Sequence, residues 1–452
     1  MLRALSFHER GTGARPGALP PHRGRVMRIT RSPSRFAGLA FALAAASLAL
    51  PACGSGGSGG SAAASAHSPI PIGYELPLTG TVALAGKQEQ EGWNLGLKVF
   101  GQTVDGHRIV TYFDDTGGDP TVALSDARSL VQQKHIQIME GPLLASEDAA
   151  VAPYLGAQHV PLDNLTICSA SQLTADARYG NALSSGWICN TPDIMAADYL
   201  YTDLGYRHVT VLANDYAFGW LSAGGFIKQF TLLGGKIDKT LWPPLTTADY
   251  GPYVSAIPKS TQAVFAETLG SGAVDFTKAY AQFGLRGKIP LYGNTTIFDY
   301  SVLPGEVPSD VLGDQMSAQY CDGINNPVNS TFTSLFKKTY HVFPGYYAEA
   351  AYVHAELAVA ALKRLSGVAT DTTTVARTLK STAVTAPRGP VRLSPVVDGP
   401  IQNDYICKVE NVHGMLEDVP IKTYPSVQPW GTLPYRTWLQ EFTADSVGRP
   451  SP

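Results

Sequence analysis

Two adjacent carboxylates, Asp114 and Asp115, are the residues whose types and spacing most directly suggest chemistry, because paired acids serve in acid–base catalysis and in cation binding. They follow a predicted strand and precede Asp119-Pro120, and a strand end with a helix cap explains them equally well. We prefer that structural interpretation. After residue 67 the chain has no G-x-S-x-G elbow and no Walker loop, and nowhere does it have H-E-x-x-H or zinc-ligand spacing. We therefore predict a protein that is not an enzyme and that uses neither a metal nor a cofactor.

The five cysteines divide into one near the N-terminus, Cys53, and four in the body of the chain. An even set in an oxidising compartment suggests two disulfide bonds, for which three connectivities exist. We favour Cys168–Cys189 and Cys321–Cys407, because these pairings join neighbours along the chain. Four free thiols are the alternative.

Residues 1–52 have the pattern of a targeting segment. They contain eight arginines and then an uncharged run of 15 residues, Phe36 to Leu50. A helix needs about 20 apolar residues to cross the hydrocarbon core of a membrane, so the run indicates a secretory signal. Because residues 1–26 would make an unusually long basic region, we expect translation to start at Met27.

The sequence Leu50-Pro51-Ala52-Cys53-Gly54 resembles a bacterial lipobox, whose cysteine becomes the lipid-bearing N-terminus of the mature protein. The Gly/Ser-rich segment that follows is typical of a flexible tether. We predict a lipid anchor on Cys53, a linker over 53–67, and an extracytoplasmic location at the cell membrane, either periplasmic or on the cell surface. An ordinary cleaved signal with an incidental cysteine is the alternative.

Charge excludes nucleic acid as a partner. The 452 residues include 34 basic and 37 acidic side chains. Residues 1–52 contain eight of the basic side chains and one of the acidic ones. The other 400 residues therefore carry 26 basic and 36 acidic side chains, a net charge of −10, which repels a phosphate backbone. With 44% hydrophobic and 10% aromatic residues the chain can bury a sizeable core, and its length suggests two or three domains.

Short apolar runs alternate with amphipathic stretches from residue 70 onwards. The predicted strands cover 70–78, 107–113, 136–139, 159–162, 208–213, 236–241, 263–266, 289–292 and 404–409. The first predicted helix ends at residue 100, and two later ones begin at 249 and 275. The other predicted helices cover 120–134, 146–157, 193–204, 218–233, 329–340, 346–366 and 371–382. This alternation, in two runs over 68–191 and 192–318, predicts an α/β protein with two doubly wound parallel-sheet lobes.

Six short motifs follow one another between residues 70 and 410. They are Ile72-Gly-x-x-x-Pro77-Leu-Thr-Gly80, Asp114-Asp-x-Gly-x-Asp-Pro120, Met139-Glu-Gly-Pro142, Asp215-x-x-Phe218-Gly219, Asp249-Tyr250, and the Tyr/Ala-rich stretch Tyr346 to Leu362. In this order, behind a lipoprotein-like signal, they resemble the type I periplasmic solute-binding proteins. That family comprises the leucine/isoleucine/valine- and amide-binding receptors of ABC importers.

The resemblance implies two lobes joined by a three-strand hinge, with crossovers near 191–193, 316–321 and 395–400. It implies that lobe 1 is 68–191 plus 319–396, lobe 2 is 192–318 plus 397–436, and a tail covers 437–452. We expect a monomer with a small-molecule ligand, the permease of an ABC importer and, through the lipid on Cys53, the membrane as its partners.

In open parallel sheets, ligands bind at the carboxyl ends of the strands, beside helix N-termini that offer free N–H groups. Two facing lobes place two such edges around one molecule, and hinge closure then buries it. The resemblance implies these ligand-binding positions: Leu143, Leu144, Ala145, Ser146, Asn164, Leu165 and Thr166 in lobe 1, and Phe218, Thr268, Leu269, Gly270, Asn294 and Thr295 in lobe 2.

The amino-acid binders of that family hold the substrate carboxylate with a hydroxyl residue near Ala145 and its ammonium with an acid near Thr295. Neither residue type stands at those positions here, and Ser146 and Glu147 are the nearest. Unpartnered ionic groups in a closed cleft cost several kcal/mol. We therefore predict a neutral or aromatic ligand, with ordinary core packing as the alternative role of each contact residue. The predicted contacts are Leu144, Leu165, Phe218 and Leu269.

Three classes of function remain. A lipid-anchored solute-binding protein that delivers its ligand to an ABC importer is the one we prefer. A ligand-sensing receptor subunit of the same fold is the second. A secreted α/β enzyme, whose catalytic residues the sequence does not reveal, is the third.

Overall fold

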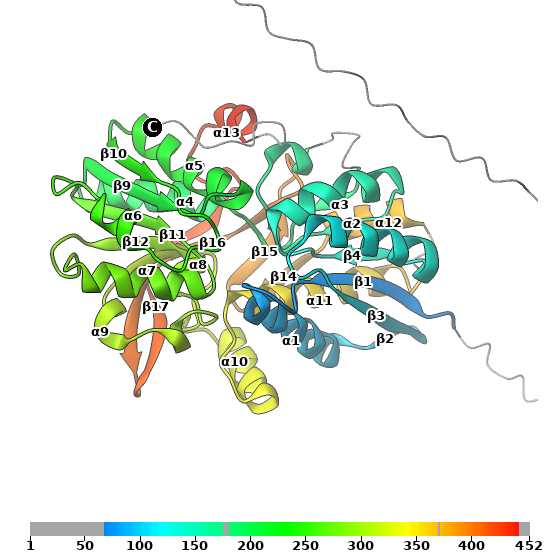
Figure 1. The fold of residues 1–452 in the computed structure, drawn as a ribbon. Helices are drawn as coiled ribbons and strands as arrows, with labels where there is room; N and C mark the ends of the chain where they lie inside the picture. The colour runs from blue at the N-terminus through cyan, green and yellow to red at the C-terminus, as the bar shows by residue number, and fades with distance from the viewer. Residues whose placement is uncertain (1–66, 175–179, 369–370, 443–452) are drawn as a thin grey trace, which may run out of the picture. The chain divides into compact units, whose positions relative to one another are not determined.

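A computed structural model describes residues 67–174, 180–368 and 371–442, which form two lobes, each built on its own β-sheet (Figure 1). The predicted start at Met27, the lipid anchor on Cys53, nearly all of the 53–67 linker and residues 443–452 of the tail lie outside the described residues. Within the described part, no helix has the length and apolar character of a membrane span.

The sheet of the first lobe has six strands in the order β2-β3-β1-β4-β5-β7. The strands are β1 (Ile70–Leu76), β2 (Thr103–Val104), β3 (His107–Asp115), β4 (Ile138–Glu140), β5 (Leu162–Asp163) and β7 (Ala182–Leu183). Only the β2–β3 pair is antiparallel. Since β1 lies between β3 and β4, the strand order reverses there, and this is the place where α/β sheets bind ligands.

Helices cover both faces of this sheet. They are α1 (Ala83–Phe100), α2 (Pro120–Ser129) with its continuation Leu130–Lys134, α3 (Ala145–Ala157), α11 (Tyr346–Arg364) and α12 (Thr372–Lys380). Alternate residues of β1, such as Ile72 and Tyr74, pack against Trp93 of α1 and Ala351 of α11. On the other face, Ala127 of α2 and Val151 of α3 pack around Met139.

The second sheet has nine strands in the order β10-β9-β11-β12-β13-β16-β15-β14, and β17 also pairs with β16. The strands are β9 (His208–Ala213), β10 (Lys236–Leu241), β11 (Ala263–Glu267), β12 (Leu291–Asn294), β13 (Gln315–Ala318), β14 (Ala383–Ala386), β15 (Gly389–Leu393), β16 (Pro400–Val412) and β17 (Met415–Val427). The strands from β10 to β13 are parallel, and those that follow are antiparallel. The order reverses at β9, the counterpart of β1.

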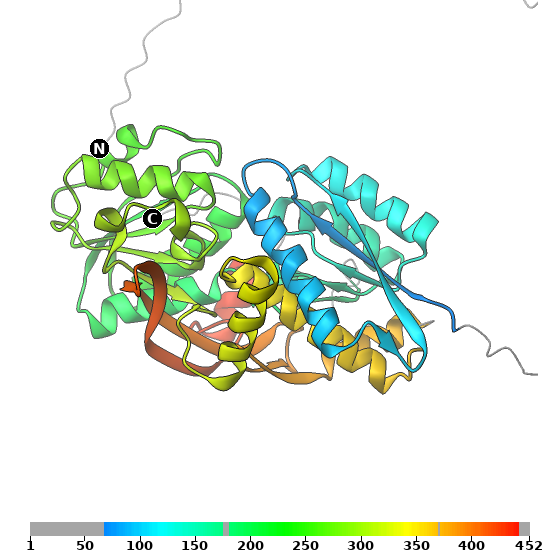
Figure 2. The same cartoon turned by 90° about the horizontal axis from the view of Figure 1, so that it is seen from below.

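The helices of the second lobe also lie on both faces of their sheet. They are α4 (Thr191–Asp198) with Tyr199–Asp203, α5 (Ala217–Leu232), α6 (Gly251–Ser255), α7 (Ser271–Gln282), α8 (Thr295–Phe298) and α9 (Pro308–Val311). On one face Phe226 of α5 stacks on Phe265 of β11 at 4.1 Å between ring centroids. Helix α10 (Pro327–Tyr340), yellow in Figure 2, lies beside α1, and α13 (Tyr435–Glu441) ends the described chain. The remaining short elements are β6 (Thr166–Ile167), β8 (Trp187–Ile188) and the 3₁₀ turns Ala170–Leu173 and Leu303–Gly305.

The chain passes between the lobes three times, in agreement with the predicted hinge. It leaves the first lobe after β8, returns after β13, and enters the second sheet again through β15 and β16. Strands β14 and β15 lie in the range predicted for lobe 1, yet β15 pairs with β16, with Arg392 opposite Ile401. The two lobes therefore share a sheet edge at the hinge, and the lobe boundaries stay a prediction.

Both predicted disulfide pairings are confirmed. Cys168 bonds to Cys189, with 5.0 Å between their Cα atoms, just before the first crossover. Cys321 bonds to Cys407, with 6.5 Å between Cα atoms, and links the segment after β13 to β16. Both bonds therefore lie at the hinge.

Most predicted elements are present, and the exceptions have local causes. Asp119 caps α2 as predicted, since its Oδ1 accepts a hydrogen bond from the N–H of Thr121 at 2.7 Å. Ser146 does not cap α3: the helix begins at Ala145, and Leu144 occupies the cap position. The strand predicted over 159–162 is wrong at its start, because His159 has a φ of 58° and the pairing begins at Leu162.

Candidate ligand-binding cleft

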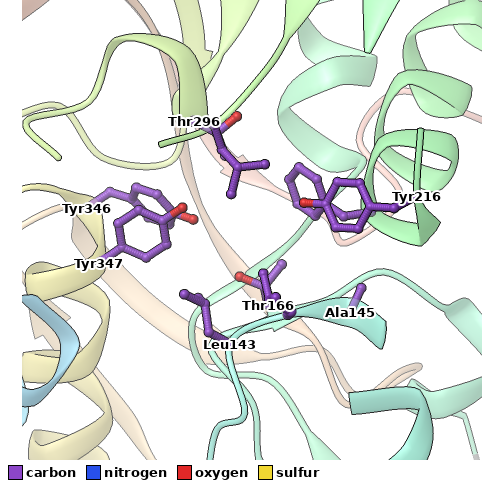
Figure 3. Close-up of a pocket in the computed structure, with 10 residues that line it drawn as sticks. Leu143, Ala145, Thr166, Tyr216, Thr296, Tyr346 and Tyr347 are labelled. Atoms are coloured by element: carbon purple, nitrogen blue, oxygen red, sulfur yellow. The ribbon is translucent and has the colours of Figure 1, made fainter. Parts of the chain in front are cut away.

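A cavity lies between the lobes at the carboxyl ends of both sheets, as Figure 3 shows. Its lining residues come from the loop after β4, from β6, from the segments that follow β9, β11 and β12, and from the first turn of α11. They are Leu143, Leu144, Ala145, Thr166, Tyr216, Phe218, Leu269, Thr296, Tyr346 and Tyr347. The cavity volume is about 10 Å³, which is room for about one water molecule, so the lobes are closed around it.

On the first lobe, the turn after β4 brings Leu143 and Leu144 to the cavity. Gly141 makes this turn possible, because it has a φ of 73° and a Cβ there would lie 2.3 Å from the carbonyl oxygen of Glu75. Glu147 then holds the start of α3: its Oε2 accepts a hydrogen bond from the N–H of Leu144 at 3.0 Å. The apolar wall of the first lobe is thus positioned by buried backbone contacts.

Thr166 reaches the cavity because its neighbours hold it. The Oδ1 of Asn164 accepts from the Thr166 N–H at 2.9 Å, and the Asn164 amide donates to Asp148 Oδ1 at 2.9 Å. The indole N–H of Trp187 donates to the Thr166 hydroxyl. Asn164 therefore positions the site without lining it.

The second lobe uses an equivalent amide. The Oδ1 of Asn294 accepts from the Thr296 N–H at 3.1 Å and so caps α8. The Thr296 hydroxyl donates to the carbonyl oxygen of Thr268 at 2.9 Å and, in Figure 3, is directed away from the cavity. Thr296 consequently offers its methyl group to a ligand, and Asn294 is a positioning residue.

Aromatic rings dominate the rest of the cavity. Tyr346 and Tyr347 lie 3.9 Å apart between ring centroids, and Phe218 lies 6.0 Å from both Tyr216 and Trp187. The hydroxyls of the three tyrosines are directed towards the centre of the cavity in Figure 3. Burial raises the pKa of Tyr216 and of Tyr346 well above its ordinary value, so these hydroxyls are neutral at physiological pH.

None of the ten lining residues is charged. Two buried acids interact electrostatically with lining tyrosines and are candidates for an ammonium partner: Glu89 with Tyr346, and Glu267 with Tyr216. Glu89 of α1 is fully buried, and burial raises its pKa well above the ordinary value, with a further increase from the nearby Glu147. Burial, followed by the charge of Asp193, raises the pKa of Glu267 in the same direction. Burial therefore favours the protonated, uncharged form of both acids.

The predicted ligand-binding residues lie in the wall of the cavity, in the wall of a neighbouring space, or outside both walls. Six line the cavity: Leu143, Leu144, Ala145, Thr166, Phe218 and Leu269. Gly270 lines a neighbouring space with Leu269, while Thr268 and Thr295 are buried. Ser146 and Leu165 do not line the cavity; Leu165 is fully buried in the core, so its position does not support a contact with the ligand. The binding role of all these residues stays a prediction.

Four lining residues were not predicted from the sequence: Tyr216, Thr296, Tyr346 and Tyr347. Tyr216 lies inside the motif Asp215-x-x-Phe218, and Thr296 is one position beyond a predicted residue. The two tyrosines of α11 open the Tyr/Ala-rich stretch, but nothing local indicates that this helix returns to the cleft.

Asp115, the second residue of the acidic pair next to the first sheet, has a structural role, in line with the interpretation we preferred. The Asp115 carboxylate accepts hydrogen bonds from the N–H groups of Leu78 at 2.8 Å, Thr79 at 3.2 Å and Gly117 at 3.0 Å. It thereby holds the loop between β1 and α1. This use of its lone pairs explains the residue without catalysis.

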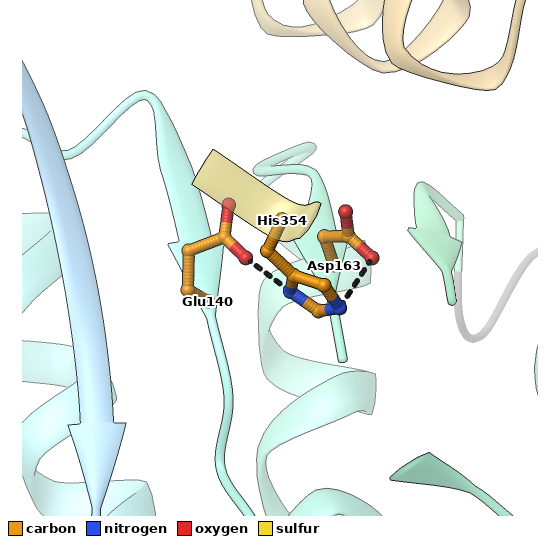
Figure 4. Close-up of side chains that lie close together, drawn as sticks. All are labelled: Glu140, Asp163 and His354. Carbon is orange, nitrogen blue, oxygen red and sulfur yellow. Dashed lines mark hydrogen bonds and ion pairs between the residues drawn. The ribbon is translucent and has the colours of Figure 1, made fainter. Parts of the chain in front are cut away.

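Glu140, Asp163 and His354 form a buried cluster in the first lobe (Figure 4). His354 Nδ1 lies 2.8 Å from Glu140 Oε2, and its Nε2 lies 3.9 Å from Asp163 Oδ1. An imidazole with two carboxylates is a donor set for a divalent cation such as Zn²⁺. Asp163, however, already accepts from the N–H and hydroxyl of Ser185 at 2.8 and 2.7 Å.

The charge near this cluster also opposes a cation. Burial first, and the guanidinium of Arg388 second, lower the pKa of His354 to about 3. We interpret the cluster as a hydrogen-bonded network that ties α11 to the ends of β4 and β5. Because α11 begins with Tyr346 and Tyr347, this network also supports the cleft.

Comparison with known proteins gives a consistent picture. The family model described as periplasmic binding protein matches residues 69–412. Leu/Ile/Val-binding protein homolog 6 of Brucella melitensis biotype 1 is 27% identical over 350 residues, which cover 75% of this chain and 87% of that protein.

Two solved structures share the fold over most of their length. An ABC transporter substrate-binding protein from Sphaerobacter thermophilus has 27% identity and a TM-score of 0.75, and the match covers 80% of this chain and 99% of that one. A solute-binding protein of an ABC transporter from Rhodopseudomonas palustris BisB5, in complex with 3,4-dihydroxybenzoic acid, has 26% identity and a TM-score of 0.75. That match covers 80% of this chain and 98% of the other.

Proposed function

The chain belongs to the periplasmic binding protein family, and we propose that it is a lipid-anchored extracytoplasmic receptor that captures a small aromatic or largely apolar solute and delivers it to an ABC importer. Its relatives are solute-binding proteins of ABC transporters. The lipid anchor on Cys53, the importer permease as partner and the class of ligand are parts of the proposal.

The observation that carries the ligand class is the uncharged lining of the cleft. A free amino acid brings an ammonium and a carboxylate, and burying them without ionic partners costs several kcal/mol. The cavity offers neutral hydroxyls from Tyr216, Tyr346 and Tyr347, aromatic faces, and aliphatic side chains. These groups suit a ring that carries hydroxyl substituents.

A carboxylate on such a ring also finds neutral partners. The first turns of α3 and α5 begin at the cavity, and N–H groups at helix N-termini stabilise anions. The relative from Rhodopseudomonas palustris was crystallised with 3,4-dihydroxybenzoic acid, which has both features. This likeness supports an aromatic acid as the first ligand to test.

The direct experiment is isothermal titration of the purified protein with 4-hydroxybenzoate, 3,4-dihydroxybenzoate, leucine and valine. We expect at least one aromatic acid to bind at micromolar concentration or tighter and neither amino acid to do so. Micromolar binding of leucine or valine would refute the ligand class. Mass spectrometry of small molecules that co-purify with the protein gives an independent identification.

Two cleft variants test the location of the site. Phe218→Ala and Thr166→Ala should each weaken binding of the aromatic acid about tenfold, which is about 1.4 kcal/mol. Circular dichroism should show that both variants remain folded. Leu232→Ala is the matched control, because Leu232 lies on the same helix as Phe218 and is 54% exposed. Unchanged affinity in both cleft variants would contradict the proposed site.

The anchor has a separate test. In cells, Cys53→Ser should move the protein from the membrane fraction to the soluble extracytoplasmic fraction. Cys321→Ser is the control, since that residue is held in a disulfide. Equal membrane association of wild type and Cys53→Ser would remove the anchor from the proposal.

A further inference from the structure

A second, larger space lies beside the cavity described above, which we call the inner cavity. The two spaces share Leu269 and Tyr347 in their walls. We call the larger space the outer chamber. Its walls include Thr81, Val82 and Leu84 from the first lobe and Gly270, Val274 and Val302 from the second. Its volume is about 420 Å³, which falls in the usual range for ligand pockets.

The volumes of the two spaces decide which of them can hold an aromatic ring. A cavity of about 150 Å³ holds a benzene ring. The inner cavity, at about 10 Å³, admits a ring only when the lobes part. The outer chamber has room for more than one ring's volume in the closed arrangement.

The outer chamber is bounded by both lobes at a point where their backbones meet. Gly270 has a φ of 59°, and a Cβ on it would lie 2.8 Å from the carbonyl oxygen of Thr81 in the facing lobe. A larger residue there would hold the lobes apart or strain the backbone. A molecule in the outer chamber therefore touches both lobes, as a molecule in the inner cavity does.

The walls of the outer chamber carry no ionisable side chain other than the neutral phenol of Tyr347. Burial, with the nearby Asp299 next, raises the pKa of that phenol above its ordinary value. Valine and leucine side chains face the space from both lobes, and Leu84 at the first turn of α1 is 49% exposed. Apolar surface of this kind is stabilised when an apolar group covers it.

We propose that the natural ligand is elongated, with an aromatic or hydroxyl-bearing head group in the inner cavity and an uncharged apolar extension of several carbon atoms in the outer chamber. This inference rests on the proposed function, because it assigns a substrate class to the same cleft. The shared residues Leu269 and Tyr347 form the passage between head group and extension.

The test is a series of aromatic acids with a growing apolar chain, titrated into the wild-type protein: 4-hydroxybenzoate, 4-methoxybenzoate, 4-butoxybenzoate and 4-hexyloxybenzoate. Burying each additional CH₂ group favours binding. We expect 4-butoxybenzoate to bind at least tenfold more tightly than 4-hydroxybenzoate. Affinity that stays level or falls along the series would overturn the inference.

A variant that fills the outer chamber locates the effect. Val274→Trp places a large side chain in the chamber from α7, away from the hydroxyls of the inner cavity. It should abolish the gain from the longer chains and change the affinity for 4-hydroxybenzoate less than twofold. Leu232→Trp, on an exposed position of α5, is the control and should behave as wild type. Loss of affinity for all members of the series in Val274→Trp alike would overturn the assignment to two compartments.

The failures are distinguishable. Binding of 4-hydroxybenzoate without any gain from the longer chains overturns the elongated ligand and leaves the proposed function intact. Binding of the longer members alone supports the elongated ligand. Failure of every member to bind overturns both the aromatic ligand class and the inference. The wild-type series needs no variant, so the result does not depend on the folding of Val274→Trp.

Discussion

The Arg388 network near the hinge and two threonines behind the cleft bury polar groups in opposite ways. At the hinge, Arg388 is completely buried, and each side-chain nitrogen has a partner: Nε donates to Gln402 at 2.8 Å, Nη1 to Glu349, and Nη2 to the carbonyl oxygen of Ser185 at 2.6 Å. Behind the cleft, the hydroxyls of Thr268 and Thr295 are buried and have no protein partner among the described residues.

The difference separates structure from function. Leaving a buried donor or acceptor unpaired costs about 1–3 kcal/mol, so folded proteins pair nearly all of them. The Arg388 network pairs every nitrogen of its guanidinium and ties α11 to β16 and to the segment before β8, whereas the side-chain amide of Gln319 near the second crossover has no protein partner among the described residues. The hydroxyls of Thr268 and Thr295, next in sequence to the lining residues Leu269 and Thr296, are left unpaired. Changes at the hinge should therefore cost stability, and changes in the cleft should cost affinity.

The largest effect is expected at Arg388. Arg388→Met should lower the free energy of unfolding by about 3–5 kcal/mol, because it leaves Glu349 buried without its cation. Urea unfolding followed by fluorescence measures this loss. Arg392→Met, on the exposed side of β15 just after Arg388, is the control and should change stability by less than about 0.5 kcal/mol. A loss below 1 kcal/mol at Arg388 would mean that the hinge is not held by this network.

The two disulfide bonds give the next largest effect. Removing Cys321–Cys407, which spans 86 residues, should destabilise the protein by about 2–4 kcal/mol. Removing Cys168–Cys189, which spans 21 residues, should cost about 1 kcal/mol less, because the shorter loop restricts the unfolded chain less. Paired Cys→Ala variants unfolded under the same conditions decide the order, and a reversed order would contradict the loop-length argument.

One contribution to the pH dependence of stability should originate outside the cleft, at Asp404. Burial raises the pKa of Asp404 to about 7 from its ordinary 3.8, against a hydrogen bond from the Ser317 hydroxyl at 3.0 Å. The folded state therefore holds this proton more tightly, and the stability it contributes is present below about pH 4 and is lost as pH rises towards 7.

Asp404→Asn removes this titration and should flatten the fall of stability between pH 5 and 7 by up to about 1.4 kcal/mol per pH unit. Unfolding curves at four pH values measure the slope. Ligand affinity should stay level between pH 6 and 8, because no lining residue of the inner cavity titrates in that range. Equal slopes in the two proteins would remove Asp404 from the explanation.

The smallest effect is expected from single hydroxyl groups, and here two tyrosines make a matched pair. Tyr216→Phe removes a hydroxyl that faces the cavity and should weaken aromatic-acid binding by about 0.5–1.5 kcal/mol with little change in stability. Tyr199→Phe removes a hydroxyl that donates to Gln315 at 3.0 Å and should lower stability by a similar amount with unchanged affinity. Ligand titration and urea unfolding of both variants measure the two effects. A loss of stability in Tyr216→Phe together with a loss of affinity in Tyr199→Phe would contradict the comparison.

Features that depend on neighbours in the chain could be predicted from the sequence. The bounds of β9 and β10, the Asp119 cap of α2 and both disulfide pairings agree with the prediction. Strand β17 was missed, although His413 and Gly414, with φ of 53° and 90°, form the turn that pairs it with β16. A His-Gly pair is a weaker turn signal than Asn-Gly, so the hairpin was not apparent.

Other features depend on parts of the chain that meet only in the folded protein. Asn164 and Asn294 do not line the cavity, and the side-chain oxygen of each accepts a hydrogen bond from the N–H of the threonine two residues later. Their contact with a ligand stays a prediction. Tyr346 and Tyr347 reach the cleft because α11 packs on α1, more than 240 residues earlier in the chain.

The sequence alone determined the α/β class, the alternation of strands and helices, the acidic body of the chain and the order of motifs that places its family. The first three follow from periodicity, capping and composition, which act over a few residues, and the family rests on the resemblance of the motifs. Only the tertiary structure decided which hydroxyls face the cavity, which amides support it, and how the outer chamber joins it. Those outcomes depend on the packing of α11 and the approach of Gly270 to Thr81, and such long-range contacts have no local signal.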